Sequence, residues 1–193
     1  MIASCLKACY NTINYYKQDM LGKYVWCIMK ILIFSDSHAS LRFMRRCVAI
    51  LKPDAIIHLG DHYDDGEAIG EEFPHLVVHQ VAGNCDRYRC SIHARTMLCY
   101  KVGGVMLYMS HGHEQRVKQG IGGLIAEARR YGAAAALYGH THVPDCHQET
   151  DGLWVLNPGS CGYGPGSAGL IETEDGNIKL CRLISPADLE ETE

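Results

Sequence analysis

Residues 29–38 read MKILIFSDSH, an apolar run that ends in Asp36, Ser37 and His38. A strand without polar alternation is typical of the buried centre of a parallel sheet, where both faces are covered. Side chains at positions i and i+2 of an extended chain point to the same side, so Asp36 and His38 could bind one ion. An acidic helix start followed by an exposed histidine would give the same residues. The stretch therefore predicts a central strand with a candidate pair of metal ligands at its carboxyl end.

Similar patches of Asp, Asn and His recur after later apolar runs. They are Gly60-Asp61, Gly83-Asn84-Cys85-Asp86, Ser110-His111-Gly112-His113, Gly139-His140 and Thr141-His142. Ligands usually sit beyond the carboxyl ends of parallel strands, so these patches predict a group of ligands at one sheet edge. Oxygen donors mixed with imidazoles suit manganese, iron, zinc and similar divalent ions. The pattern indicates a metallohydrolase.

Three of the patches carry specific expectations. A single carboxylate can bridge two ions, and Asp61 is the candidate bridge. Gly-Asn is by itself typical of a turn, whereas the side-chain oxygen of Asn84 could bind an ion and moderate the negative charge of a two-ion site. His140 and His142 stand at i and i+2, so they can face one region and still contact two different ions.

The chain alternates strands and helices in its first half and is rich in hairpins in its second. Strands are predicted at 30–35, 55–59, 76–81, 95–102, 105–109, 134–138, 146–150, 153–156, 168–173 and 178–183. Helices are predicted from a cap at Ser40 to residue 51, around 66–73, where Asp64 and Asp65 would be a solvated start, and at 122–131. Gly103-Gly104 is typical of a two-residue hairpin turn. Two sheets packed face to face with outer helices would accommodate both halves.

Composition limits the partners of the chain. Its 193 residues fit one domain with a sizeable core. A net charge of −4 gives no electrostatic case for nucleic acid or a membrane surface. The ten Cys residues could form a disulfide framework, but there is no secretory signal and no CxxC pair. We therefore expect reduced, mostly buried thiols and a cytoplasmic protein.

The two ends of the chain differ from its body. Residues 1–28 are rich in Tyr, Asn and Cys without a clear amphipathic period. We expect them to be an extension outside the domain or an upstream start before Met29, with an amphipathic helix docked on the body as the alternative. Residues 29–184 are expected to form the domain, and 185–193 an acidic tail.

The motifs DSH, GD, GNCD, SHGH and GHTH, in this order, resemble those of the calcineurin-like metallophosphoesterase superfamily. Over residues 29–184 the chain is most similar to its small bacterial and archaeal YfcE-type phosphodiesterases, and Asn157-Pro158-Gly159-Ser160 also resembles a segment of that group. The resemblance implies an α/β fold of the α+β kind, a four-layer αββα sandwich with two mixed β-sheets flanked by helices. It also implies two ions, one held by Asp36, His38 and His142, the other by Asn84, His111 and His140, with Asp61 bridging them.

Such a site supports hydrolysis of phosphate esters. Two neighbouring ions lower the pKa of a shared water, which attacks phosphorus in line as hydroxide. The resemblance therefore implies a metal-dependent phosphodiesterase for small phosphate esters, with manganese as the first candidate and iron, zinc, nickel or cobalt as alternatives. The expected catalytic residues are Asp61, Asn84, Cys85, Asp86 and His111, and the expected substrate contacts are Asn84, Arg87 and His113.

One position departs from the wider superfamily. Many members carry His where this chain has Cys85, and a thiol is a poorer proton donor at neutral pH than an imidazolium. Cys85 therefore predicts substrates with good leaving groups, another residue as the acid, or a contact role for the thiol. Asp86 is expected to orient a nearby histidine. Arg87 could hold a phosphate oxygen or a surface salt bridge, and His113 could contact the substrate or be structural.

Two other functions are compatible with the fold that we expect. A metallophosphoesterase-like subunit of the retromer coat uses this fold as a protein scaffold, but decayed ligands would then be expected and all seven positions here carry donor atoms. A nuclease acting on DNA ends is disfavoured because the chain has no basic extension. A homodimer would be common for an enzyme of this size.

Overall fold

The computed structural model describes residues 16–18, 24–26, 28–86 and 94–190, and within these ranges it contains two five-stranded sheets. The first sheet consists of β3 (Met29–Phe34), β4 (Ala55–His58), β5 (Val77–Gln80), β11 (Ala168–Glu174) and β12 (Asn177–Ile184). The second consists of β6 (Met97–Val102), β7 (Val105–Ser110), β8 (Ala135–Leu137), β9 (Asp145–Gln148) and β10 (Trp154–Asn157). The strand orders are β12-β11-β3-β4-β5 and β6-β7-β8-β10-β9. All ten predicted strands are confirmed, with small differences at their ends.

Both sheets mix parallel and antiparallel pairs. In the first sheet β3, β4 and β5 run parallel, while β11 is antiparallel to both β3 and β12. In the second sheet β8 is parallel to β7 and β10, and the edge strands β6 and β9 are antiparallel to their neighbours. The parallel strands of each sheet end at the same edge, which is the arrangement that gathers ligands.

Alternate residues of β3 pack into different layers. Ile31 and Ile33 belong to the core between the two sheets, whereas Leu32 and Phe34 pack beneath α1 (Arg42–Leu51) and α2 (Tyr63–Glu72). The continuous apolar run is explained by this burial on both faces, because successive side chains of a strand point to opposite sides.

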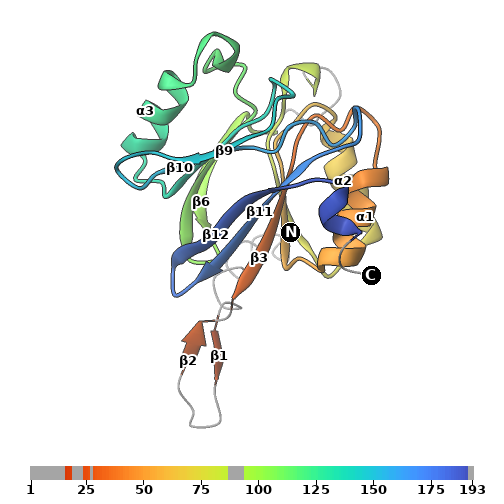
Figure 1. Cartoon of the computed structure of the whole chain (residues 1–193), viewed down its shortest axis with the longest axis horizontal. Helices are drawn as coiled ribbons and strands as arrows, with labels where there is room; N and C mark the ends of the chain where they lie inside the picture. The colour runs from red at the N-terminus through yellow and green to blue at the C-terminus, as the bar shows by residue number, and fades with distance from the viewer. Residues whose placement is uncertain (1–15, 19–23, 27, 87–93, 191–193) are drawn as a thin grey trace, which may run out of the picture.

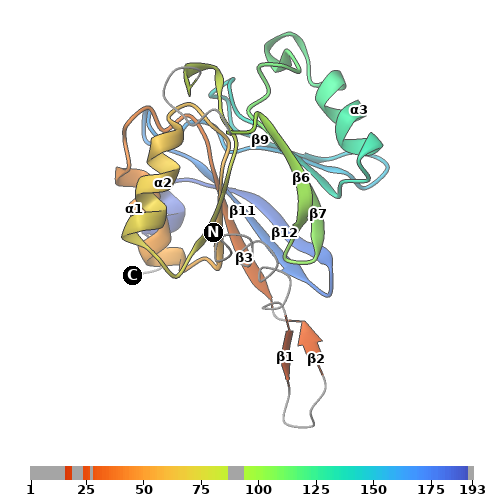
Figure 2. The same cartoon turned by 180° about the vertical axis from the view of Figure 1, so that it is seen from behind.

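The second sheet is covered in the same way. Ala135 and Leu137 of β8 face the core between the sheets, and Ala136 packs against α3 (Gly122–Arg130). Figures 1 and 2 show α1 and α2 outside one sheet and α3 outside the other. The predicted αββα sandwich is therefore confirmed.

The starts of two helices differ from the prediction. Leu41, not Ser40, is the N-cap of α1, and no side chain caps this helix. The helix therefore begins one residue later than predicted, and just before it the Ala39 amide donates a 2.8 Å hydrogen bond to Asp65 Oδ2. Asp65 is buried in α2, which begins at Tyr63, and is not part of a solvated start.

The terminal segments differ in how they relate to the sandwich. β1 (Tyr16–Gln18) and β2 (Tyr24–Trp26) form an antiparallel pair that stands apart from both sheets (Figure 1). These six residues are strands, whereas residues 1–15, 19–23 and 27 lie outside the described residues, so the extension and the helix considered for residues 1–28 both stay predictions. Near the other end, a 3-10 turn at Ala187–Leu189 places the buried Leu189 side chain in the core beneath α1.

Candidate metal centre

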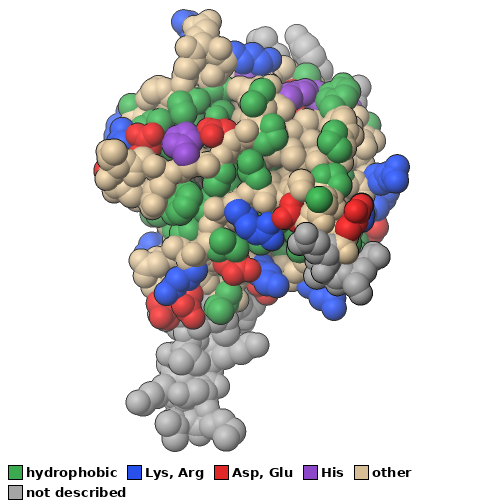
Figure 3. Space-filling model, viewed as in Figure 1, with side chains coloured by type: hydrophobic (Ala, Val, Ile, Leu, Met, Phe, Trp, Pro, Cys, Tyr) green, Lys and Arg blue, Asp and Glu red, His purple; other side chains and the backbone are tan. Residues whose placement is uncertain are grey.

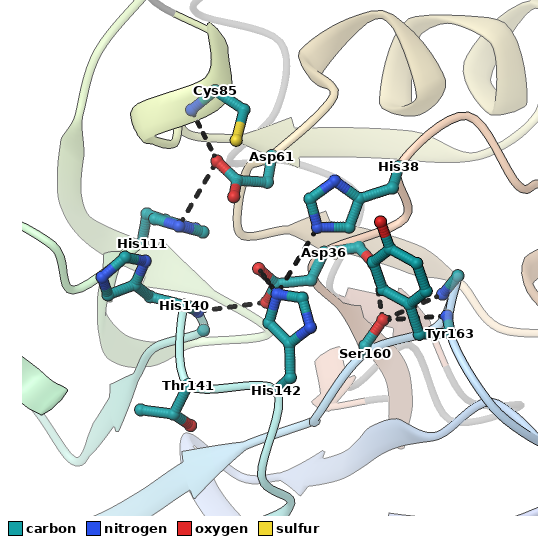
Figure 4. Close-up of polar contacts among 12 residues, drawn as sticks. Asp36, His38, Asp61, Cys85, His111, His140, Thr141, His142, Ser160 and Tyr163 are labelled. Carbon is teal, nitrogen blue, oxygen red and sulfur yellow. Dashed lines mark hydrogen bonds and ion pairs between the residues drawn. The ribbon is translucent and has the colours of Figure 1, made fainter.

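All seven predicted ligands lie at one edge of the two sheets. Asp36 and His38 follow β3, Asp61 follows β4, Asn84 opens a 3-10 turn (Asn84–Asp86) after β5, His111 follows β7, and His140 and His142 follow β8. Figure 4 shows the Asp36, His38, Asp61, His111, His140 and His142 side chains directed toward a common space. The sequence brings them together because each follows a strand whose carboxyl end lies at this edge.

We call Asp36, His38 and His142 the first ligand group. Asp36 Oδ1 lies 3.1 Å from His142 Nε2, and the Nε2 atoms of His38 and His142 are 3.4 Å apart. Their donor atoms all lie within 4.8 Å of one another. The other oxygen, Asp36 Oδ2, accepts the amide of His140 at 3.0 Å.

We call Asp61, His111 and His140 the second ligand group, and its donor atoms also lie within 4.8 Å of one another. His111 Nε2 is 3.4 Å from Asp61 Oδ1 and 3.1 Å from Asn84 Oδ1. Asp61 also lies within the same distance of His38, which belongs to the first group. Its carboxylate therefore stands between the two groups.

The hydrogen bonds at the centre fit a bound cation. His111 Nδ1 lies 2.7 Å from the Leu59 carbonyl oxygen, which can only accept, so Nδ1 carries the ring proton. The Nε2 lone pair of His111 therefore faces the oxygens of Asp61 and Asn84 with no hydrogen between them. Asp36 Oδ1 is likewise a buried oxygen that accepts no hydrogen bond of good geometry, although His142 Nε2 lies 3.1 Å from it. Such clustered acceptors are unfavourable unless a positive charge lies among them.

Burial sets the protonation of the histidines. It lowers the pKa of His111 to about 4 and also lowers the pKa values of His38 and His140. These imidazoles are therefore neutral at pH 7, which is the form that binds metal.

The two carboxylates respond differently to the site. Burial raises the pKa of Asp36 to about 6, because ionised oxygens lose their hydration there. Burial also raises the pKa of Asp61, but the attraction to His111 when that imidazole is protonated and the hydrogen bond from the Cys85 amide outweigh it, so the net shift is downward. Asp61 is thus held ionised between the two groups.

Five of the ligands have an unusual backbone conformation. The φ angles of Asp36, His38, Asp61, His140 and His142 are +54°, +45°, +58°, +69° and +60°. This left-handed region costs a residue other than glycine roughly 1–2 kcal/mol. Such strain persists where the surrounding structure enforces it, and it is concentrated at functional sites.

Asp86 anchors the loop that carries Asp61. Its Oδ2 atom accepts the amides of Asp61 and Gly83 at 2.9 and 2.7 Å, and its Oδ1 atom accepts those of His62 and Tyr63 at 2.8 Å each. The described contacts of Asp86 give it a backbone role, and the expectation that it also acts on a histidine or in the chemistry stays a prediction. Asp86 is a positioning residue.

The strand-to-loop segment after β10 holds the remaining ligand loops, which motif reading did not reveal. Asn157 Nδ2 donates to the Gly139 carbonyl at 3.1 Å and to Thr141 Oγ1 at 2.9 Å, which fixes the loop of His140 and His142. Ser160 Oγ donates to the Asp36 carbonyl at 2.7 Å. The resemblance of Asn157–Ser160 to a family segment was the only sequence signal for these contacts.

The other expected site residues have different positions. The Cys85 amide donates to Asp61 Oδ1 at 2.9 Å, and burial raises the pKa of the Cys85 thiol to about 11. His113 lies beside the ligand imidazoles, with ring centroids 5.5 Å from His111 and 6.2 Å from His140. Arg87 lies outside the described residues.

Tyr163 is a neighbour of the centre that sequence reasoning missed. Its ring stacks on His142, with centroids 5.6 Å apart and an interplanar angle of 22°, and lies 4.8 Å from the His38 ring. Figure 4 shows it at the side of the first ligand group. Only its position in a Gly-rich loop marked it in the sequence.

Comparisons with known proteins agree with this geometry. The family model described as the calcineurin-like phosphoesterase superfamily domain matches residues 29–176. The chain belongs to this superfamily. A probable metallophosphoesterase of Mycoplasma pneumoniae is 30% identical over 138 residues, which are 68% of this chain and 78% of the relative. A phosphodiesterase of Methanocaldococcus jannaschii is 28% identical over 165 residues, 76% of this chain and 94% of the relative.

The fold of this metallophosphoesterase domain also recurs among solved structures. A predicted phosphoesterase from Streptococcus pneumoniae superposes with a TM-score of 0.62 at 24% identity, over 82% of this chain and 98% of that one. Family membership supports phosphoester hydrolysis and implies the use of divalent metal. The ligand groups described above are candidates for holding that metal.

Two further observations concern the described part of the chain outside this site. No helix in the described part of the chain is long and apolar enough to cross a membrane. On the face shown in Figure 3, basic and acidic side chains are interspersed and do not form a field of one sign.

Proposed function

We propose that this chain is a dinuclear metal-dependent phosphodiesterase that hydrolyses small phosphate esters by in-line attack of water on phosphorus. The observation that carries the proposal is the pair of ligand groups with Asp61 between them. The phosphodiesterase relative supports the choice of diesters. Mixed carboxylate and imidazole donors accept manganese, iron, zinc, nickel and cobalt, and we propose manganese as the first candidate.

The ligand groups define which residues would hold each ion. Asp36, His38 and His142 would bind the first, Asn84, His111 and His140 would bind the second, and Asp61 would contact both. Two divalent ions supply positive charge that acidifies water and neutralises the oxygens of a phosphate ester. The candidate ligands are two carboxylates and five neutral donors, so two divalent ions would leave the site with a net positive charge. A positive site favours an anionic substrate.

The protein's own contribution is to keep these donors fixed before substrate binds. The Leu59 carbonyl fixes the tautomer of His111, and Asp36 Oδ2 holds the backbone of the loop that carries His140. Asp86 holds the Asp61 loop through four amides. Fixed donors stabilise developing charge without reorganising at the moment of reaction.

Cys85 has a contact role in this proposal. A thiol is a poorer proton donor at pH 7 than an imidazolium, so Cys85 is a weak candidate for protonating a leaving group. We therefore propose that the preferred esters have leaving groups that depart without a strong acid from the protein. His113, beside His111 and His140, is the candidate contact for the substrate.

Hydrolysis of bis-p-nitrophenyl phosphate by the metal-stripped protein, with and without added manganese, tests the proposal. We expect manganese-dependent release of p-nitrophenol. Asp61→Asn should lower that rate by about a thousandfold or more, because both ions lose a shared charged ligand. The variant should stay folded, since an Asn oxygen can still accept the Cys85 amide.

Asp64→Asn is the matched control, because Asp64 lies three residues away on the exposed surface of α2. It should retain the wild-type rate. Near-normal turnover by Asp61→Asn would overturn the ligand assignment. An absence of metal-dependent hydrolysis in the wild type would instead favour a protein-interaction scaffold with this fold.

We also infer a reducing, cytoplasmic setting. The six cysteines within the described ranges are free thiols, which supports this inference because disulfides form in oxidising compartments. Alkylation of the protein in freshly lysed cells should label these cysteines after unfolding without prior reduction. Labelling that appears only after reduction would contradict the inference.

A further inference from the structure

Tyr163 is an exposed aromatic side chain at the first ligand group. It is 58% exposed, although one side of its ring stacks on His142 and another part approaches His38. The ring therefore covers two of the residues that would hold one ion and still leaves more than half of its surface to solvent. Such a surface beside a catalytic centre is available to a ligand.

The loop of Tyr163 is fixed to the strand end that carries Asp36. Ser160 Oγ accepts the amides of Gly162 and Tyr163 at 3.2 and 3.0 Å and donates to the Asp36 carbonyl. A Cβ atom at Gly162 would lie 1.9 Å from the Ser37 carbonyl oxygen, so only glycine permits this close approach. Tyr163 is thus positioned relative to the ligands before any substrate binds.

The loop also borders a space that could contain the rest of an ester. Gly162 and Gly164, on either side of Tyr163, line a cavity of about 410 Å³ together with Arg42 and Arg46. Arg46 lies 3.8 Å from Glu190, whose side chain is largely exposed. The backbone on both sides of Tyr163 therefore borders an open volume with positive charge, although Tyr163 itself is not among the residues that line it.

We propose that Tyr163 is the platform on which a planar ring of the substrate stacks, so that the site prefers phosphate esters that carry an aryl group or a nucleobase. This inference shares one assumption with the proposed function, namely that the phosphate group binds at the two ligand groups. Stacking of a base on an aromatic side chain strengthens binding by about tenfold or more. Tyr163 would then select the organic part of the ester while the ligand groups bind its phosphate.

The test compares ligands that differ by one ring. Dissociation constants of adenosine 5′-monophosphate and ribose 5-phosphate are measured by calorimetry on the manganese-loaded protein, and phenyl phosphate is compared with methyl phosphate in the same way. We expect the ring-bearing ligand of at least one pair to bind about tenfold more tightly to the wild type. A preference in the first pair alone identifies a nucleobase, and a preference in both identifies any planar ring.

Three variants assign the preference to the Tyr163 ring. Tyr163→Leu should abolish it, and Tyr163→Phe should retain it. Tyr131→Leu, at an exposed tyrosine that follows α3, is the matched control and should leave it unchanged. The proposal is overturned if the wild type shows no ring preference in either pair, or if Tyr163→Leu keeps it.

A structural role for Tyr163 gives a different result. Manganese affinity, followed by electron paramagnetic resonance of the free ion, should be the same in wild type and Tyr163→Leu. A parallel loss of manganese affinity would mean that Tyr163 only supports His38 and His142, and would overturn the proposal. If the wild type hydrolyses no ester but its ring preference still depends on Tyr163, the proposed function fails and this inference stands.

Discussion

The chain reverses direction at both ends of the two sheets, but with different residues. At the ligand edge positive φ angles occur at glycines such as Gly60 and Gly112, but also at Asp, His and Ala residues, among them five of the seven candidate ligands. At the opposite edge the β6–β7 turn uses Gly103 and Gly104, with φ of +59° and +79°, and the β11–β12 turn uses Asp175 and Gly176. Glycine has no steric penalty in this region, whereas Asp and His do.

The difference shows which turns serve folding alone. At the opposite edge no side chain is needed, so glycine is used at most positions and the predicted two-residue hairpin forms without strain. At the ligand edge the side chain itself is needed, so the strained conformation is kept. It is enforced by a hydrogen bond to Asp86 and by hydrogen bonds from Asn157 and Ser160. We expect this edge to trade stability for a preformed ion site.

The largest expected effect on stability comes from removing the anchor of the ligand edge. Asp86→Asn replaces one of two acceptor oxygens with an amide group that would face amide donors. Two of its four hydrogen bonds would be lost in a buried place, at a cost of about 4 kcal/mol in the free energy of unfolding. Urea unfolding measures this cost, and a manganese titration should show weaker binding in the same variant.

The matched control for Asp86→Asn is Asp64→Asn, which should change neither quantity. A stable Asp86→Asn protein with normal manganese affinity would show that the strained loops do not need this anchor, and the contrast between the two edges would lose its explanation.

Part of the stability that the protein loses at low pH should come from His79, a residue between the sheets and away from both the ligand edge and the opposite edge. His79 of β5 is buried against the Tyr100 hydroxyl of β6, at 2.7 Å, and burial lowers the pKa of His79 to about 4. An unfolded histidine has a pKa near 6.5. The unfolded state therefore binds more protons between these values, and stability that is fully present above pH 6.5 is lost as the pH falls toward 4.

His79→Gln removes this titrating group. Between pH 7.5 and 4, with chelator present, the variant should lose about 3 kcal/mol less unfolding free energy than the wild type. Urea unfolding at the two pH values measures the difference. If wild type and His79→Gln lose the same unfolding free energy, the acid sensitivity comes from other buried groups, which include those of the ligand edge.

At the opposite edge a substitution should affect stability alone. An alanine at Gly103 would take a conformation with φ of +59°, and its Cβ atom would lie 2.3 Å from Thr173 Oγ1. Gly103→Ala should therefore destabilise the protein by about 2 kcal/mol while hydrolysis per folded molecule stays within about twofold. Thermal unfolding and initial rates measure the two effects.

Gly152→Ala separates strain from contact in this comparison. Gly152 has φ of +92° but nothing within 4 Å of the added Cβ atom. Gly152→Ala should lower the free energy of unfolding less than Gly103→Ala does. The difference between the two losses is the cost of the clash with Thr173. A loss of activity in Gly103→Ala would show that the two edges are not independent.

The sequence predicted the strands and the proximity of the candidate ligands for the same physical reason. Each apolar run predicts a buried strand from its own residues, and each candidate ligand directly follows such a run. The signals for the strands and for the ligands are therefore both local in the sequence. The contacts that hold the ligands are not local, because Ser160 and Asp36 are 124 residues apart and Asp65 and Ala39 are 26 apart. For that reason the burial of Asp65, the backbone role of Asp86 and the place of Tyr163 could not be predicted from motif spacing.

The smallest expected effect is that of backbone strain alone. It can be measured at His62, a ligand-edge residue that is not a candidate ligand. His62 has φ of +82° and ψ of +72°, and its amide donates to Asp86 Oδ1, which glycine would preserve. His62→Ala removes the imidazole but keeps a Cβ atom in the left-handed region, whereas His62→Gly removes both. The glycine variant should therefore be about 1 kcal/mol more stable than the alanine variant, the reverse of the order found inside helices. If differential unfolding measurements give alanine the higher stability, backbone strain does not distinguish the ligand edge from its opposite.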